Sequence, residues 1–139
     1  MDVVVLIARI LFVWVFVVSA IGHFTALEQM SGFAKARGVP LAKPAVLLSG
    51  VAMLAGAVSV LLGIWGDLGA LVLAATVLAI AFLMHHFWTE TDPEAKMMDR
   101  VQFNKDLSLG GAALALFALF ALVSELGLTV TGPLFNVSL

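Results

Sequence analysis

Four long apolar runs, separated by short polar segments, occupy most of this 139-residue chain. The runs are Val3–Phe24, Ala45–Trp65, Leu68–Trp88 and Leu107–Leu126. A helix needs about 20 predominantly apolar residues to cross the hydrocarbon core of a bilayer, so each run is long enough. Hydrophobic residues make up 63% of the chain and charged residues only 12%, which leaves a water-soluble fold too little polar surface. We therefore expect one all-α domain over residues 1–139, an integral membrane four-helix bundle.

Composition excludes several functions. A net charge of −2 without a basic stripe argues against a nucleic-acid partner, whereas the lipid bilayer is a partner that the hydropathy requires. The absence of cysteine excludes disulfides, thiol catalysis and iron–sulfur ligation. No phosphate-binding loop, Ser-His-Asp set or catalytic carboxylate pair is visible, so we assign no catalytic residue and leave enzyme activity open. The first run lacks a preceding basic segment, and we expect it to be a retained helix rather than a signal peptide.

Lysine and arginine indicate the orientation. Outside the apolar runs they occur only in the two long loops, residues 25–44 and 89–106, and none lies in the turn near Asp67 or at either terminus. Positively charged loops remain on the cytoplasmic side, so both termini are expected outside. The six residues are Lys35, Arg37, Lys43, Lys96, Arg100 and Lys105.

Local signals predict short amphipathic helices in both long loops. Thr25-Ala26-Leu27-Glu28 fits a capping box at the start of the first, which Gly38 and Pro40 would end. Asp92 precedes a second short helix, over about residues 93 to 102 and before the fourth span. Asp67 is expected to cap the third span.

Small residues form stripes on the second and fourth spans. Such stripes let helix backbones approach closely, which predicts a compact bundle and also offers faces for docking to a larger membrane complex. The second span carries Ser49, Ala52, Gly56, Ser59 and Gly63, and the fourth begins with Gly110-Gly111-Ala112-Ala113.

Arg9 is an ionisable residue deep within the first span. Arg9, Phe16 and His23 recur every seven residues and share a face, which should look into the bundle because a lipid-facing guanidinium would lack partners. Glu125 is the only acid near enough in depth to form a structural ion pair with Arg9. Snorkelling to outer water, or contact with a substrate anion or a quinone carbonyl, are the alternatives.

The cytoplasmic ends of three spans carry polar residues that should converge at one depth. Imidazole binds ligands and relays protons near neutral pH, and a Lys–Asp pair can hold it or bind a head group. We therefore expect a ligand-binding crevice there, with a quinone tail among Phe82, Phe87 and the fourth span. An interfacial polar belt anchored by Trp88 is the alternative. The candidate residues are His23, then His85 and His86, of which at most one faces the core, and Lys105 with Asp106.

Metal centres are less favoured by this pattern. The histidines could bind zinc or copper, but the Glu-x-x-His pattern of di-iron bundles is absent, and we assign no metal site. A bis-histidine haem would need His23 opposite His85 or His86, and we favour a quinone over haem.

The order of these motifs resembles the DoxX family of small four-helix bacterial membrane proteins. The resemblance rests on Arg9 with Ile21-Gly22-His23-Phe24, on Ser49-Gly50, and on His85-His86-Phe87-Trp88 followed by Asn104-Lys105-Asp106. It extends over nearly the whole chain, although Asp106 stands where the family usually has Asn. It implies a multi-pass protein of the bacterial cytoplasmic membrane. The family includes the membrane subunit of a thiosulfate:quinone oxidoreductase.

Three hypotheses follow. The first is a redox-linked membrane subunit that binds a quinone or similar lipid-soluble ligand near the histidines. The second is a non-catalytic accessory or scaffold subunit of a larger membrane complex. A small-solute transporter is less favoured, because the spans lack broken helices and polar groups at the midplane.

Overall fold

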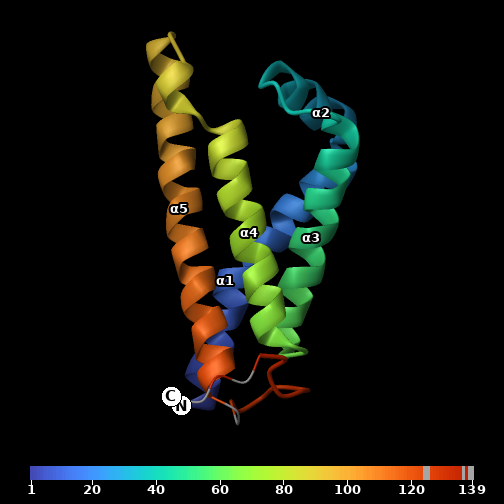
Figure 1. Ribbon diagram of the computed structural model, residues 1–139, viewed down its shortest axis with the longest axis vertical. Coiled ribbons are helices and arrows are strands. Elements are labelled where there is room, and N and C mark those ends of the chain that lie inside the picture. The colour runs from blue at the N-terminus through green and yellow to red at the C-terminus, as the bar shows by residue number, and fades with distance from the viewer. Residues whose placement is uncertain (124–125, 136, 138–139) are drawn as a thin grey trace.

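The computed structural model describes residues 1–123, 126–135 and 137, and it is helical over most of its length (Figure 1). No strand occurs among these residues, which confirms the all-α prediction. Four helices, α1, α3, α4 and α5, are long and apolar enough to cross a membrane. In chain order the elements are α1 (Asp2–Thr25), α2 (Leu27–Ala36), α3 (Ala42–Leu62), α4 (Gly66–Met84), the 3₁₀ turn η1 (Phe87–Thr89) and α5 (Pro93–Leu122).

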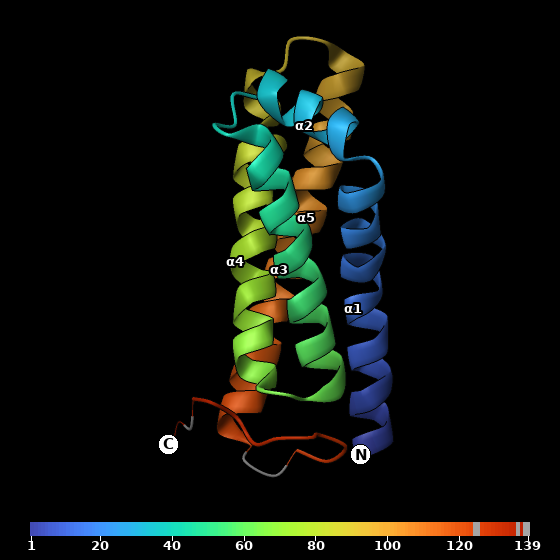
Figure 2. The same ribbon diagram turned by 90° about the vertical axis from the view of Figure 1, so that its right-hand side faces the viewer.

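The long helices pack in the order α5, α4, α3, α1, and α2 packs across α3 and α1. The start of α1 and the C-terminal segment, residues 126–135, lie at one end of the bundle, and α2 lies at the other (Figures 1 and 2). We name these the terminal end and the α2 end. An even number of spans places both termini on one side, as the sequence predicts.

Glycines in the helices allow close packing within the chain. A Cβ at Gly56 would lie 2.8 Å from the Leu73 side chain, and one at Gly110 would lie 2.6 Å from Leu78. A Cβ at Gly69 would overlap Ser59. Much of the small-residue surface is therefore used inside the bundle, where it lets dispersion contacts form at short range. The buried core includes Val13, Phe16, Met53, Ala57, Val60, Leu73, Val77, Ala113 and Phe120.

Two helix boundaries differ from the sequence expectation. α5 is one helix of 30 residues, and the division into a short helix followed by a fourth span was wrong. Asp92 accepts a hydrogen bond from the Ala95 N–H at 2.8 Å, and no glycine or proline interrupts the helix before Gly110. α4 ends at Met84, so the two adjacent histidines follow the helix instead of closing it.

Two expected caps are absent. The Thr25 hydroxyl donates to the Ile21 carbonyl at 2.9 Å, and α2 begins after Ala26 without a side-chain cap. Asp67 lies inside the first turn of α4, where its carboxylate accepts from the Phe135 N–H at 2.5 Å. Tertiary contact with the C-terminal segment therefore replaces the local cap that the sequence suggests.

The C-terminal segment, residues 126–135, folds across the terminal end of the bundle (Figure 2). The Val130 N–H donates to the Leu62 carbonyl at 3.1 Å and the Thr131 N–H to the Gly63 carbonyl at 3.1 Å. These bonds satisfy carbonyls at the end of α3, where the helix leaves them without internal partners. The segment therefore ties the α3–α4 turn to the end of α5.

Candidate functional site

A cavity of about 1210 Å³ lies between the helices toward the α2 end. All five α-helices contribute to its wall, and α2 contributes Met30, Phe33 and Ala34. Most of the wall is apolar, including Val15, Phe16, Leu48, Met53, Ile80, Leu83, Met84 and Leu109. The volume exceeds the 300–1,000 Å³ typical of ligand sites, so it has room for a ring with part of a hydrocarbon tail.

Ionisable groups from the middle of α5 and from the turn after α4 line the same cavity. Asp106 is buried, with Oδ1 3.5 Å from the Lys105 Nζ and Oδ2 3.8 Å from the His85 Nε2. Lys105 also donates to the Gln102 amide oxygen at 2.5 Å. A 30 Å hydrocarbon core takes about 20 residues of α5, so about ten N-terminal residues project beyond it and Asp106 lies about one turn inside. The cavity therefore has a charged end near the membrane boundary.

His23 lines the cavity from α1 and is buried. Its Nδ1 lies 3.1 Å from the Val46 carbonyl oxygen and 3.0 Å from the Ser49 Oγ. The Ser49 hydroxyl itself donates to the Val46 carbonyl at 2.9 Å. These contacts fix the ring against α3, where a Cβ at Gly50 would lie 2.8 Å from the His23 Cβ.

An ionic network continues from the cavity to the surface of the α2 end. Arg37 Nη1 lies 2.6 Å from Asp99 Oδ2, and Arg37 Nη2 lies 3.6 Å from Glu90 Oε2. The Nδ1 of His85 lies 3.5 Å from Asp99 Oδ1. His85 therefore lies between two carboxylates of α5, those of Asp99 and Asp106.

The sequence reasoning missed Arg37, Glu90 and Asp99 as neighbours of the site. One signal was available, because Asp99 precedes Asp106 by seven residues and so shares its face of a continuous helix. The expected break before the fourth span concealed this periodicity. Arg37 pairs across 62 residues, which no local pattern reveals.

His86 is not among the residues that line the cavity. Its Nδ1 lies 2.7 Å from the Thr89 Oγ1 in the η1 turn. Phe82 and Phe87 also lie outside the lining, which corrects the expectation that they would surround a ligand tail. They pack around Phe103, with ring centroids 5.3 and 5.5 Å from it, in a group that includes Trp88. The chain therefore uses these aromatic residues to join η1 to α5.

Arg9 is fully buried near the terminal end, on the inward face that the heptad spacing indicates. Its Nη2 donates to the Leu128 carbonyl at 2.7 Å, and its guanidinium carbon lies 6.0 Å from the centroid of the Phe120 ring. Glu125, its expected partner, lies outside the described residues, so the ion pair stays a prediction.

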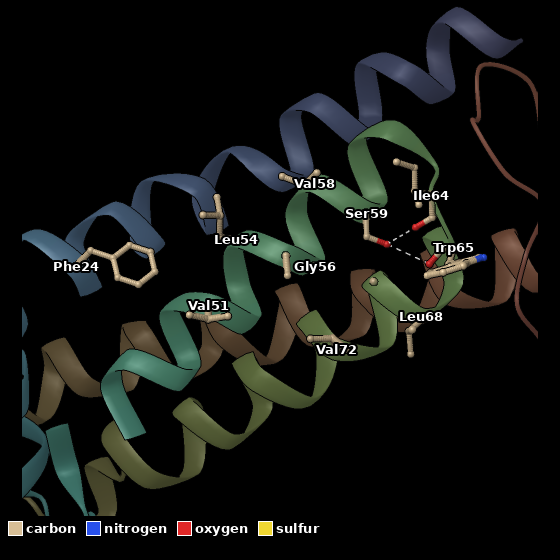
Figure 3. A pocket seen from close by; sticks show the side chains of 12 residues that line it. Phe24, Val51, Leu54, Gly56, Val58, Ser59, Ile64, Trp65, Leu68 and Val72 are labelled. Atoms are coloured by element: carbon tan, nitrogen blue, oxygen red, sulfur yellow. Dashed lines mark hydrogen bonds between the residues drawn. The ribbon is translucent and has the colours of Figure 1, made fainter. Parts of the chain in front are cut away.

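A second depression of about 550 Å³ lies on the outer face of α3 and α4 (Figure 3). Its wall carries no ionisable side chain. The Ser59 hydroxyl donates to the Ile64 and Trp65 carbonyls, at 2.7 and 3.0 Å. Its other lining residues are Phe24, Val51, Leu54, Ala55, Gly56, Val58, Leu68, Gly69 and Val72. The lining of this groove is mostly apolar, which suits hydrocarbon.

Cofactor and metal chemistry would have to use the groups already described. Among residues 1–123, 126–135 and 137, no three His, Asp or Glu side chains are grouped as metal ligands. The cavity instead brings hydrogen-bonding groups of both kinds to one end of an apolar chamber. This arrangement can orient a small amphipathic molecule.

The fold and cavity define a small multi-pass membrane protein with a polar-ended chamber between its helices. A sequence model of the DoxX family matches residues 4–86, more than half of the chain, and the protein belongs to this family. The match ends at His86, so Lys105 and Asp106 lie beyond it. No curated protein and no solved structure gives a significant match to the chain.

Proposed function

We propose that this protein binds a quinone or a similar lipid-soluble ligand in the cavity at the α2 end, as a redox-linked membrane subunit. The observation that carries the proposal is that a large cavity is apolar over most of its wall and charged at one end. His23, His85, Lys105 and Asp106 all line it. A quinone has this division of polarity, since its ring carries oxygen atoms and its tail is hydrocarbon.

The polar end supplies the hydrogen-bonding groups that a quinone ring needs. Lys105 is a donor, Asp106 is an acceptor, and His85 lies between two carboxylates. Because His85 and Asp106 are largely withdrawn from water, their hydrogen bonds to a ligand would be stronger than at an open surface. The methionines and leucines of the wall would surround the tail.

The redox role rests on membership of the DoxX family together with the chemistry of the cavity. The chain has no cysteine and therefore no thiol or iron–sulfur ligand, and we propose that a partner subunit exchanges electrons with the bound ligand. We place the protein in the bacterial cytoplasmic membrane, with the α2 end in the cytoplasm and both termini outside, because of the lysines and arginines at that end.

A non-catalytic scaffold role is the alternative. The stripes of small residues suggest this role, because they could dock to another helix. Much of that surface, however, packs against the chain's own side chains, as at Gly56, Gly69 and Gly110. Gly111 has open space around it, so part of the α5 face is available to another helix. The cavity favours ligand binding over this alternative.

Equilibrium binding of a decyl-substituted benzoquinone to the protein in mild detergent tests the proposal. We expect saturable binding of one molecule per chain. His85→Gln should weaken it about tenfold, because a hydrogen bond at a charged site contributes about 1.5–3 kcal/mol. His86→Gln is the matched control, since this neighbouring histidine lies outside the cavity lining.

The two histidine variants separate site binding from partitioning into detergent. Partitioning would give non-saturable uptake that neither substitution changes. Absence of saturable binding by wild-type protein with native helix content would disprove the proposed function. Co-purification of a stoichiometric partner subunit without any bound ligand would favour the scaffold role.

A further inference from the structure

One buried acceptor of the cavity wall has no hydrogen-bond donor in the part of the chain that the structure describes. Asp106 Oδ2 is buried and receives no hydrogen bond from the described residues, because the His85 Nε2 at 3.8 Å is too distant. A buried carboxylate oxygen without a donor costs free energy, so a ligand that brings a donor is favoured at this position. Asp106 is 4% exposed and lines the cavity from α5.

A second acceptor follows from the hydrogen bonds of His23. The Val46 carbonyl can only accept, so the hydrogen on the His23 ring is placed on Nδ1, 3.1 Å from that oxygen. Ser49 uses its own hydrogen toward the same carbonyl, which leaves its oxygen to accept from Nδ1 as well. The neutral ring therefore offers Nε2 as an acceptor. Asp106 of α5 and His23 of α1 can therefore each accept a hydrogen bond from a ligand.

The donors nearby face acceptors of the protein itself, although the His85 nitrogens are too distant from them for full hydrogen bonds. Lys105 donates to the Gln102 amide oxygen and faces Asp106 Oδ1 at 3.5 Å. His85 has one nitrogen toward Asp99 and the other toward Asp106, both of which are acceptors. A ligand carbonyl would compete with these carboxylates for hydrogen atoms, whereas a ligand hydroxyl would supply one.

We infer that the cavity selects the hydroxyl-bearing, reduced form of its ligand, a hydroquinone or similar phenol, over the carbonyl form, with Asp106 as the specificity-determining residue. This inference rests on the proposed function and deepens it. A site built around an acceptor discriminates against an analogue without the hydroxyl, since its buried oxygen then stays unpaired.

The test compares two probes, a decyl-substituted benzoquinone and its hydroquinone, under anaerobic conditions with purified protein in mild detergent. Wild-type protein should bind the hydroquinone about tenfold more tightly than the quinone, as expected when one charge-assisted hydrogen bond is gained. Asp106→Asn keeps the shape of the side chain and adds an N–H donor. It should reduce the ratio of affinities to about twofold or less, or reverse it.

Glu94→Gln is the matched control, because it also neutralises an acid of α5 but lies exposed outside the cavity. It should leave the ratio unchanged. Equal affinity of wild-type protein for the two probes would overturn the inference and leave the proposed function standing. Binding of neither probe would overturn both. If Asp106→Asn does not fold, the ratio of affinities in wild-type protein still tests the preference for the hydroquinone. If folded Asp106→Asn keeps the wild-type ratio, Asp106 is not the specificity-determining residue.

Discussion

Arg37 and Asp99, 62 residues apart, form an ion pair with 2.6 Å between Nη1 and Oδ2. Arg37 directly follows α2, and Asp99 lies in the second turn of α5. The pair therefore connects the helix that covers the cavity to the helix that carries Asp106. Both side chains are largely withdrawn from water, with 14% and 8% exposed.

Arg37→Ala should lower the free energy of unfolding by about 2 kcal/mol, because it leaves the buried Asp99 carboxylate without its strongest donor. Thermal unfolding in detergent, followed by circular dichroism, measures the change. Lys43→Ala is the control, since the Lys43–Glu28 pair is 54% and 81% exposed and should contribute well under 1 kcal/mol. Equal effects of the two substitutions would show that Arg37 contributes no more than a surface pair.

Gly69→Ala should destabilise the bundle by about 2 kcal/mol through overpacking. The new Cβ would overlap Ser59 and lie 3.0 Å from the Gly56 carbonyl oxygen, so α3 and α4 would have to separate. Gly111→Ala is the matched control, with no atom within 4 Å of the added Cβ. It should be neutral or stabilising by about 0.5–1 kcal/mol, because alanine favours a helix interior. Unfolding curves that rank the variants in the opposite order would contradict this packing.

The predicted pairing of Arg9 with Glu125 can be measured by a double-mutant cycle with Arg9→Met and Glu125→Gln. If the residues interact, the cycle should give a coupling free energy of about 1 kcal/mol or more in unfolding experiments. Additive effects would discard the pair. Arg9 would then be held by the Leu128 carbonyl and the Phe120 ring that it already contacts.

The proposed orientation can be tested by cysteine labelling, since the natural chain contains no cysteine. Gly132→Cys at the terminal end and Glu94→Cys at the α2 end are both exposed positions. A membrane-impermeant maleimide added to intact cells should label the first and reach the second only after permeabilisation. The reverse pattern would invert the topology.

The spans could be predicted from sequence because a bilayer imposes a length and a composition on each helix. The inward orientation of Arg9 could also be predicted, since a guanidinium in lipid requires protein partners and the heptad spacing defines the face. The helix ends near the site could not be predicted in this way. α4 ends at Met84, directly before His85 and His86, but the apolar Phe87 and Trp88 that follow made the expected span longer.

The environment of the candidate site depends on tertiary contacts. Whether His85 or His86 lies against the cavity is determined by the turn after α4, in which Thr89 bonds to His86. The donation of the His23 Nδ1 to Val46 depends on how closely α1 approaches α3 at Gly50. Neither relationship follows from sequence spacing, which gives direction on one helix and not distance between helices.

Photo-crosslinking with an azido-substituted benzoquinone bearing a decyl tail tests the central claim most directly, because it locates the ligand. After illumination and mass spectrometry of peptides, the account predicts adducts on the cavity wall, at residues such as Met30, Met53, Met84 and Leu109, that excess unlabelled ligand prevents. Adducts confined to the outer groove of α3 and α4, at Val51, Leu54, Val58 or Val72, or labelling that excess ligand does not reduce, would contradict a binding site between the helices.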